Sequence, residues 1–224
     1  MSVELDHLFV CTSVGAPEAE RLAAVGLIEG QSNLHPGQGT ACRRLFFHNA
    51  YLELLWVHNE EEARGEAVRP LRLWERWLYQ QTGYSPFGLC LRPSKRGDEP
   101  AGLPFETWAY RPPYLPDPLQ IDVAENSDHP AEPLLFHASF GVRPDEYPSE
   151  RKQPLEHPSG FREVTQVNIS LPERTVSKAL KVIEEGGLVK LCPGEAHLLE
   201  VVFDRAAQGK ATDFRPHLPL VFRW

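Results

Sequence analysis

Hydrophobic and polar positions follow one another in blocks that predict short strands and helices from the start of the chain. Residues 3–11 form an apolar run of strand length. Residues 16–26 have a proline near the start, apolar residues at helical spacing and a glycine at the end, which is the pattern of a short helix. Two more apolar runs, 41–47 and 51–57, have a short connection between them and predict a hairpin. The N-terminal quarter therefore reads as a strand, a helix and further strands.

The middle of the chain changes character because proline becomes frequent. Residues 69–83 carry leucine and tryptophan at helical spacing and predict one helix. Beyond it, strand-like segments alternate with proline-rich turns, at 85–93, 105–115, 119–126 and 132–141. Proline cannot donate to a central ladder, so these segments are expected to form edge strands, turns or extended loops.

The C-terminal third returns to the N-terminal pattern, with a strand over 162–172, a helix over 173–187 and strands over 188–194 and 197–204. The last stretch, 214–224, could add a closing strand. The two ends can be laid over each other. The segment LDHLFV overlays VTQVNI, and YLELLWV overlays HLLEVVF, which sets Gln166 against His7 and Glu200 against Glu53. A repeated unit that cannot cover its own sheet is expected to pair with another copy.

The two glutamates are the informative part of this repeat. Both Glu53 and Glu200 lie within runs of leucine and valine. A carboxylate in an apolar strand is costly to bury unless it is paired, protonated or bound to a metal. The alternative is that each side chain points to the solvent face of a half-exposed sheet.

These segments, with the HPGQGT loop before the hairpin, resemble a glyoxalase-like domain of the vicinal oxygen chelate superfamily. The resemblance implies an α+β fold in which paired βαβββ modules form a cupped, partly open mixed β-sheet around a cleft. Residues 1–224 are then expected to form a single domain. Its parts would be a first module over 3–57, proline-rich middle strands over 84–140 and a C-terminal module over 163–204.

The resemblance also implies a site. Metal-dependent members place ligands on the first and last strands of each module, so the carried-over ligands are His7, Glu53, Gln166 and Glu200. Such a set suits a divalent ion such as Zn²⁺, Ni²⁺, Mn²⁺ or Fe²⁺. An open position on the ion could bind a small oxygenated substrate, with Glu200 or Glu53 as the catalytic base.

A second arrangement stays open, in which the proline-rich middle is itself the second module. The first-strand position would then be apolar, near Gly88 to Cys90, and Asp122 would be the only candidate carboxylate near the last strand. The C-terminal unit would become an appended half-module. The sequence match favours the pairing with 163–204.

Three further side chains are candidates for substrate binding. Arg44 shares the face of Glu53 if the hairpin loop is Asn49–Ala50, whereas a three-residue loop would turn Arg43 inward. His35 lies on a loop that could cover the cleft, and Trp108 belongs to an aromatic segment that could form a wall for a flat ligand.

Composition narrows the partners. The net charge of −8 opposes binding to nucleic acid or to an anionic membrane. The four cysteines have no metal-finger spacing, and no apolar run approaches the ~20 residues of a transmembrane helix. No secretory pattern opens the chain, so the expected location is cytoplasmic, with a small-molecule ligand as partner and a homodimer as a further expectation.

Two classes of function follow. The first is a metal-dependent lyase, isomerase or dioxygenase, and the second is a binding or resistance protein that uses the cleft without catalysis or metal. A third reading is a scaffold without a ligand. Convergence of the four ligand positions to within about 2.0–2.6 Å of one point would favour the metal enzyme. Ion pairs of Glu53 and Glu200 with arginine would favour the others.

Overall fold

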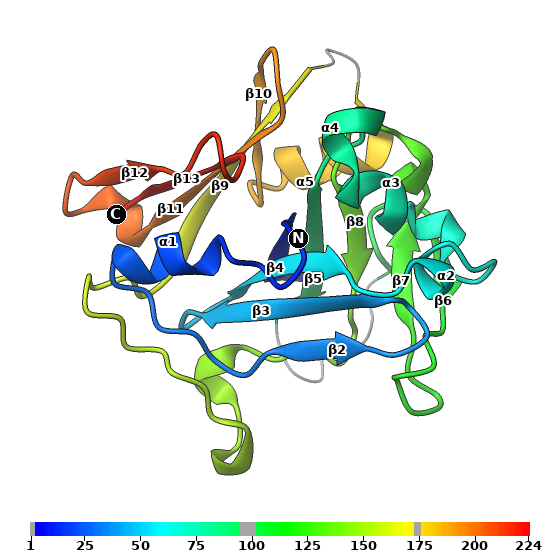
Figure 1. Ribbon diagram of the computed structural model, residues 1–224, viewed down its shortest axis with the longest axis horizontal. Helices are drawn as coiled ribbons and strands as arrows, with labels where there is room; N and C mark the ends of the chain where they lie inside the picture. The colour runs from blue at the N-terminus through cyan, green and yellow to red at the C-terminus, as the bar shows by residue number, and fades with distance from the viewer. Residues whose placement is uncertain (1–2, 95–101, 173–175) are drawn as a thin grey trace.

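Two mixed β-sheets and five short α-helices make up the computed structural model, which describes residues 3–94, 102–172 and 176–224. The larger sheet has eight strands and curls, whereas the smaller sheet has five strands and holds the C-terminus (Figure 1). The spatial order of the larger sheet is β2 (Asn33–His35), β3 (Thr40–Phe46), β4 (Tyr51–Val57), β1 (Val3–Cys11), β5 (Phe87–Pro93), β8 (Leu134–His137), β7 (Ile121–Ala124) and β6 (Thr107–Tyr110). This α+β architecture, with a cupped and partly open sheet, is the one that the sequence predicted.

The larger sheet consists of two halves with the same strand order. Strands β1 and β4 pair in parallel, as do β5 and β8, and the two halves meet where β1 pairs antiparallel with β5. The proline-rich middle is therefore the partner of the first module. The preferred pairing of the first module with 163–204 is not formed, because the central edge of the first module, β1, is already hydrogen-bonded to β5.

The C-terminal segment builds the smaller sheet by itself. Its order is β10 (Lys190–Pro193), β9 (Val164–Leu171), β11 (Leu198–Phe203), β13 (Leu220–Arg223) and β12 (Ala211–Asp213). Helix α5 (Lys178–Glu185) packs its buried Leu180 and Ile183 into the apolar core that the smaller sheet shares with the larger sheet. The predicted helix began at residue 173, and residues 173–175 lie outside the described part of the chain.

Alternation of side chains along the strands divides the core in two. Leu8 and Val10 of β1 face the side on which the smaller sheet contributes Ile169 and Phe203, all within one apolar cluster. Phe9 and the other side chains of its parity face the concave side of the larger sheet and belong to a second cluster. The concave side is therefore free to hold a cavity, while the opposite side joins the two sheets.

The segment 69–83 does not form the single helix that its spacing predicts. It contains the 3-10 turn η1 (Arg69–Leu71) followed by α3 (Leu73–Trp77) and α4 (Tyr79–Thr82), with Arg72 in the left-handed region at φ 57°. Tertiary contacts explain the break. The Arg72 guanidinium donates to Asp128 at 2.8 Å, and the fully buried Arg76 donates to the Glu132 carbonyl at 2.7 Å. These bonds outweigh helix propensity.

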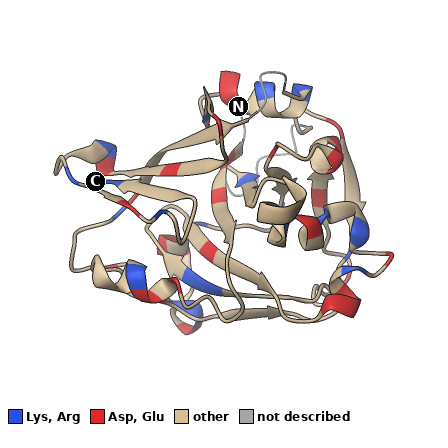
Figure 2. Cartoon of the chain, turned by 45° about the horizontal axis from the view of Figure 1, so that its top comes forward, with Lys and Arg blue, Asp and Glu red and all other residues tan. Residues whose placement is uncertain are grey.

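The remaining helices, α1 (Ala19–Ala24) and α2 (Glu60–Ala63), are short. Leu22 of α1 lies in the apolar cluster that joins the two sheets. Figure 2 shows Lys and Arg residues interspersed with Asp and Glu over both sheets, rather than gathered in one stripe. Among the described residues, no helix has the length and apolar character that crossing a bilayer requires.

Candidate active site

A cavity of about 380 Å³ lies on the concave side of the larger sheet. Its floor comes from side chains of one parity on β1 and β4, including His7, Phe9, Tyr51 and Glu53. Pockets of this size, with a mainly apolar lining and a few polar groups, are typical of small-molecule sites.

A β-bulge places two adjacent polar side chains at this cavity. The pairing of β1 with β5 shifts between Leu5 and His7, so that Asp6 has no partner in the ladder. Both Asp6 and His7 consequently line the cavity, although neighbours in a regular strand point to opposite faces. The His7 Nδ1 atom lies 2.7 Å from Asp6 Oδ1, and the His7 ring stacks on Tyr51 at a centroid distance of 4.4 Å. The contact with Asp6 assigns a proton to Nδ1 of His7 and leaves Nε2 for the cavity.

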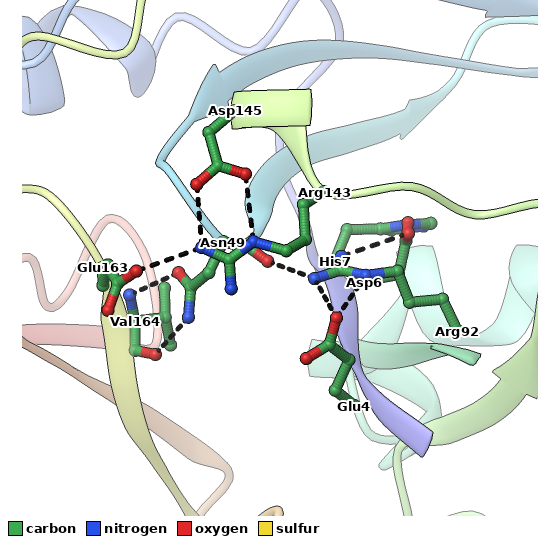
Figure 3. Close-up of polar contacts among 9 residues, drawn as sticks. All are labelled: Glu4, Asp6, His7, Asn49, Arg92, Arg143, Asp145, Glu163 and Val164. Atoms are coloured by element: carbon green, nitrogen blue, oxygen red, sulfur yellow. Dashed lines mark hydrogen bonds and ion pairs between the residues drawn. The ribbon is translucent and has the colours of Figure 1, made fainter. Parts of the chain in front are cut away.

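Asp6 is in turn held by a buried arginine (Figure 3). The Arg92 side chain, 1% exposed, lies 3.4 Å from Asp6 Oδ2, donates to Glu4 at 2.9 Å and donates to the Asn49 carbonyl at 2.7 Å. The Asn49 side chain donates to the Val164 carbonyl at 2.8 Å and accepts from the Val164 amide at 2.9 Å. A continuous polar chain thus runs from His7 to the first residue of the smaller sheet.

Glu53 is the most unusual charged group in the cavity. It is 6% exposed, and no ion pair to it occurs among the described residues. Arg44 is its cross-strand partner, but the Arg44 guanidinium donates to the Gln31 carbonyl at 2.7 Å and stacks over the Phe46 ring. The Cys42 thiol is a close neighbour, and burial followed by the charge of Glu53 raises its pKa well above the usual value. A buried carboxylate without a cationic partner is costly, which makes Glu53 a candidate functional group.

His35 lines the cavity as a neutral side chain. Its Nδ1 lies 3.0 Å from Thr40 Oγ1, and its Nε2 lies 2.9 Å from the Asn33 amide nitrogen. Burial lowers the pKa of His35, which favours the neutral form. Above it, Tyr114 donates to the Gln38 side chain at 3.1 Å, so the segment between β6 and β7 covers this part of the cavity.

The remaining predicted site residues lie elsewhere. Glu200 of β11 accepts from Asn168 at 2.7 Å and from Arg223 at 2.5 Å, and the exposed Gln166 donates to the same Asn168 at 2.7 Å. Gln166 and Glu200 both belong to the smaller sheet, because their strands, β9 and β11, pair with each other and not with β1. The structure therefore does not bring Gln166 and Glu200 together with His7 and Glu53, and this is a correction to the predicted ligand set.

The arginine and tryptophan candidates are also outside the lining. The hairpin register that pairs Arg44 with Glu53 puts both on one face, but the Arg44 side chain is held at the sheet edge. Arg43 is bound to Glu29, with its Nη1 donating to the Ala16 carbonyl at 3.0 Å. Trp108 packs edge-on against Tyr110 at 6.3 Å, behind the cavity wall.

The four positions that the resemblance reserves for metal ligands do not form a complete donor set. Through the equivalence of the two halves, the counterpart of His7 is Gly88 or Cys90, and the counterpart of Glu53 is Phe136 or Ala138. Of these four residues, only Cys90 has a side chain that could bind a metal, and burial raises the pKa of its thiol well above the usual value. Within the described chain, candidate donors fall into two separate groups, Asp6–His7–Cys90 and His35–Cys42–Glu53.

Both groups are partly occupied by contacts within the protein. In the first, Asp6 is already bound to His7 and Arg92, and in the second both His35 nitrogens are hydrogen-bonded, whereas His7 Nε2 faces the cavity and Glu53 has no ion pair among the described residues. The folded chain therefore does not present the four-ligand set that the resemblance implies, because the second half supplies neither an imidazole nor a carboxylate at the equivalent positions.

Sequence patterns do not single out several side chains of the candidate site. Asp6, Tyr51 and Arg92 contribute to it, yet each lies in a segment that the pattern predicts only as a strand. One signal was available for Asp6, because two adjacent polar residues interrupt an apolar run there. Tyr110 belongs to the aromatic segment that was expected to form a wall, and it lines the cavity where Trp108 does not. Nothing local marks Tyr147, which reaches the cavity from the 143–151 segment.

Comparison with known proteins defines the class. A family model described as a glyoxalase-like domain matches residues 5–182, so the chain belongs to the glyoxalase-like domain family. None of the curated proteins that were searched matches the chain. The matched span includes both halves of the larger sheet and ends in α5.

Among solved structures, a hypothetical protein from Staphylococcus aureus is similar over 99% of both chains, with a TM-score of 0.54 and 10% identity. A methylmalonyl-CoA epimerase in complex with methylmalonyl-CoA and NH4+ is 15% identical, with a TM-score of 0.41, over 64% of this chain and 100% of its own. The methylmalonyl-CoA epimerase from Mycobacterium tuberculosis is 16% identical, with a TM-score of 0.38, over 61% of this chain and 87% of its own. At these identities the similarity concerns the fold.

Proposed function

We propose that this glyoxalase-like protein is an enzyme that moves a proton at a carbon next to a carbonyl group in a small oxygenated substrate. The observation that carries the proposal is the buried Glu53 carboxylate, which lines the cavity without a cationic partner beside the oriented imidazole of His7. A carboxylate with few hydrogen bonds and little water around it is a competent general base. The activity belongs to the isomerase and lyase part of the predicted range.

The chemistry divides between the two side chains. Glu53 takes the proton from carbon, and the electron pair of that C–H bond moves onto the carbonyl oxygen. Protonated His7, whose Nδ1–H is held by Asp6, offers Nε2–H to the oxygen and stabilises the enolate. Return of the proton by Glu53 to the same face of the same carbon restores the substrate. If that carbon carries a hydroxyl group, His7 gives its Nε2 proton to the former carbonyl oxygen and then takes the hydroxyl proton, so that Glu53 can return its proton to the former carbonyl carbon. The product is the isomeric hydroxycarbonyl compound, and no co-reactant is needed.

The strand register supports these two roles of His7 and Glu53. His7 pairs with Tyr51, and Phe9 pairs with Glu53, so His7 and Glu53 are diagonal neighbours on adjacent strands. A substrate lying across β1 and β4 can therefore present its carbon to Glu53 and its oxygen to His7. Asp6, itself held by Arg92, keeps the imidazole oriented with Nε2 toward the substrate.

The divalent ion predicted from the resemblance is not part of this proposal, because the donor positions of the second half carry Gly88 or Cys90 and Phe136 or Ala138. Protein that has been dialysed against a chelator should keep its full rate. Loss of activity that Zn²⁺ or Mn²⁺ restores stoichiometrically would contradict the metal-free mechanism.

Deuterium incorporation tests the proposal without knowledge of the natural substrate. We expect the protein to accelerate exchange of the carbon-bound protons of α-hydroxyketones in D2O, measured by proton NMR against a buffer blank. Glu53→Gln should abolish the acceleration, since the amide removes the base and preserves the shape. Equal exchange with wild-type and Glu53→Gln protein would exclude the mechanism, and tight ligand binding without exchange would instead support a binding protein.

A further inference from the structure

The cavity has a polar end and an apolar end, because the strands that line it run in a fixed register. Along β4 the cavity-facing residues are Tyr51, Glu53 and Leu55, and the parallel β1 contributes His7 beside the first of them. The cavity lining therefore becomes apolar in the direction from His7 to Leu55. Glu53 lies at the boundary.

The apolar end is closed by the segment that departs from helical geometry. Leu71 and Leu73 both line the cavity and are each 3% exposed, on either side of the left-handed Arg72. A continuous helix would turn residues two apart to different faces, so the left-handed residue is what aims both leucines at the cavity. Leu134 of β8 and Val123 of β7 complete this end.

One polar atom at the lining of the apolar end is unsatisfied. Tyr110 lines the cavity and is 4% exposed, and its hydroxyl is buried without a hydrogen-bond partner in the described structure. A buried hydroxyl that lacks a partner is rare in folded proteins and costs stability. A ligand that brings an acceptor oxygen to this end would satisfy it.

Exposed apolar side chains also lie at the cavity. Four large hydrophobic side chains are exposed in the described chain, and two of them, Leu34 and Phe140, line this cavity beside the polar Asn33 and Arg151. They add apolar contact area for a ligand.

We infer that the substrate has an oxygenated head and an aromatic or alicyclic body, and that the far end of the body carries a hydrogen-bond acceptor for Tyr110. The head lies at His7 and Glu53, and the body extends past Leu55 to Leu71 and Leu73. Because this inference names the substrate class of the same cavity, it rests on the proposed function for the chemistry of the head.

Three α-hydroxyketones test the inference: hydroxyacetone, which has no body, α-hydroxyacetophenone, which has an aryl body, and its para-methoxy derivative, which adds an acceptor. We expect thermal shift and deuterium exchange to rank the para-methoxy derivative first and hydroxyacetone last. Tyr110→Phe should weaken binding of the para-methoxy derivative by roughly threefold to tenfold and leave α-hydroxyacetophenone unchanged. The folded protein should stay equally stable or become more stable, since an unpaired hydroxyl is removed.

A second variant tests the volume of the apolar end. Leu73→Trp should fill it, so both aryl ketones should bind at least tenfold more weakly while hydroxyacetone exchange persists. If Leu73→Trp does not fold, the Tyr110→Phe comparison decides by itself. Equal binding of all three ketones, or equal effects of Tyr110→Phe on both aryl ketones, would overturn the inference.

The same experiment separates the two proposals. If hydroxyacetone exchanges as well as the aryl ketones in a Glu53-dependent manner, the substrate class is wrong and the proposed function stands. If the aryl ketones bind in the predicted order but no exchange depends on Glu53, the substrate class stands and the proposed function fails.

Discussion

Asp6 and His7 are consecutive residues whose side chains meet at the same cavity, with Oδ1 of Asp6 2.7 Å from Nδ1 of His7. Only the bulge in β1 makes this contact possible, because an unbroken strand would separate the two side chains. The contact fixes which ring nitrogen of His7 faces the cavity.

Replacement of Asp6 by asparagine tests this relationship. The neutral amide removes the negative charge that stabilises a ring with protons on both nitrogens, so the exchange rate should fall by about tenfold or more. Nitrogen-15 NMR of the His7 ring reports which ring nitrogens carry protons. Glu4→Gln is the matched control, since it alters the other carboxylate on Arg92 without touching His7, and its rate should stay close to that of the wild type. An unchanged nitrogen-15 spectrum of His7 in Asp6→Asn would contradict the role of Asp6.

Replacement of Glu53 in the larger sheet and of Glu200 in the smaller sheet should have sharply different effects on the exchange rate. Glu200 lies in the smaller sheet beside Arg223, outside the cavity, so Glu200→Gln should keep the full exchange rate while Glu53→Gln loses it. The Glu200–Arg223 pair is partly exposed, and its loss should lower the free energy of unfolding by about 1 kcal/mol or less. Paired exchange assays and urea titrations of the two variants measure both quantities. A Glu200 variant with no activity would return this residue to the site.

Gly88 has no room for a side chain. A Cβ atom at this position would lie 2.0 Å from Cε1 of Phe9. Gly88→Ala should therefore lower the free energy of unfolding by about 1–3 kcal/mol through overpacking. Phe9→Leu removes the obstructing ring edge, and in that background the added methyl group should cost much less. A Gly88→Ala protein with the wild-type unfolding midpoint would show that Phe9 moves freely.

Stability should fall in mild acid because of His157. This side chain accepts from the Ile28 amide at 3.1 Å through Nδ1 and donates from Nε2 to the Phe46 carbonyl at 2.9 Å, which requires the neutral ring. Burial lowers the pKa of His157 below the ordinary histidine value of 6.5. The unfolded chain therefore takes up a proton that the folded chain does not as the pH falls below about 6.5. Stability is fully present above that pH and decreases below it.

Urea unfolding between pH 8 and pH 5 measures how the free energy of unfolding changes with pH on both sides of the ordinary histidine pKa of about 6.5. His157→Gln should be less stable at neutral pH and should show a flatter pH profile. His35, whose pKa burial also lowers, leaves a residual slope of the same sign. His129→Gln serves as a control, because that side chain is 53% exposed and its profile should parallel the wild type.

The apolar runs along the chain located most of the strands, whereas the architecture was implied by the resemblance of the segments around His7 and Glu53 to a glyoxalase-like domain. The apolar pattern could not choose the partner of the first module. The proline content of the middle segment argued against central strands, yet β5 ends at Pro93 and pairs in the centre of the sheet through residues 87–92. The match between the two chain ends reflected similar local structure in different sheets.

The site was harder to predict than the fold, because its determinants are non-local. Arg44 is paired with Glu53 through the hairpin, but its guanidinium is drawn to the Gln31 carbonyl, which no spacing rule reveals. Tyr110 and Leu71 reach the cavity through strand order and through one left-handed residue. Sequence patterns define which face a side chain occupies, whereas the partner that holds it depends on the tertiary fold.

The contact between Phe9 and Gly88 limits which residues the second half can carry. Gly88 is one of the two positions that can correspond to His7, and the Phe9 ring fills the space beside it, so a histidine could not enter there unless Phe9 became small at the same time. A chain with only one of these changes would carry either a clash or a cavity, and each is destabilising. Two coordinated substitutions are therefore needed to place an imidazole at Gly88.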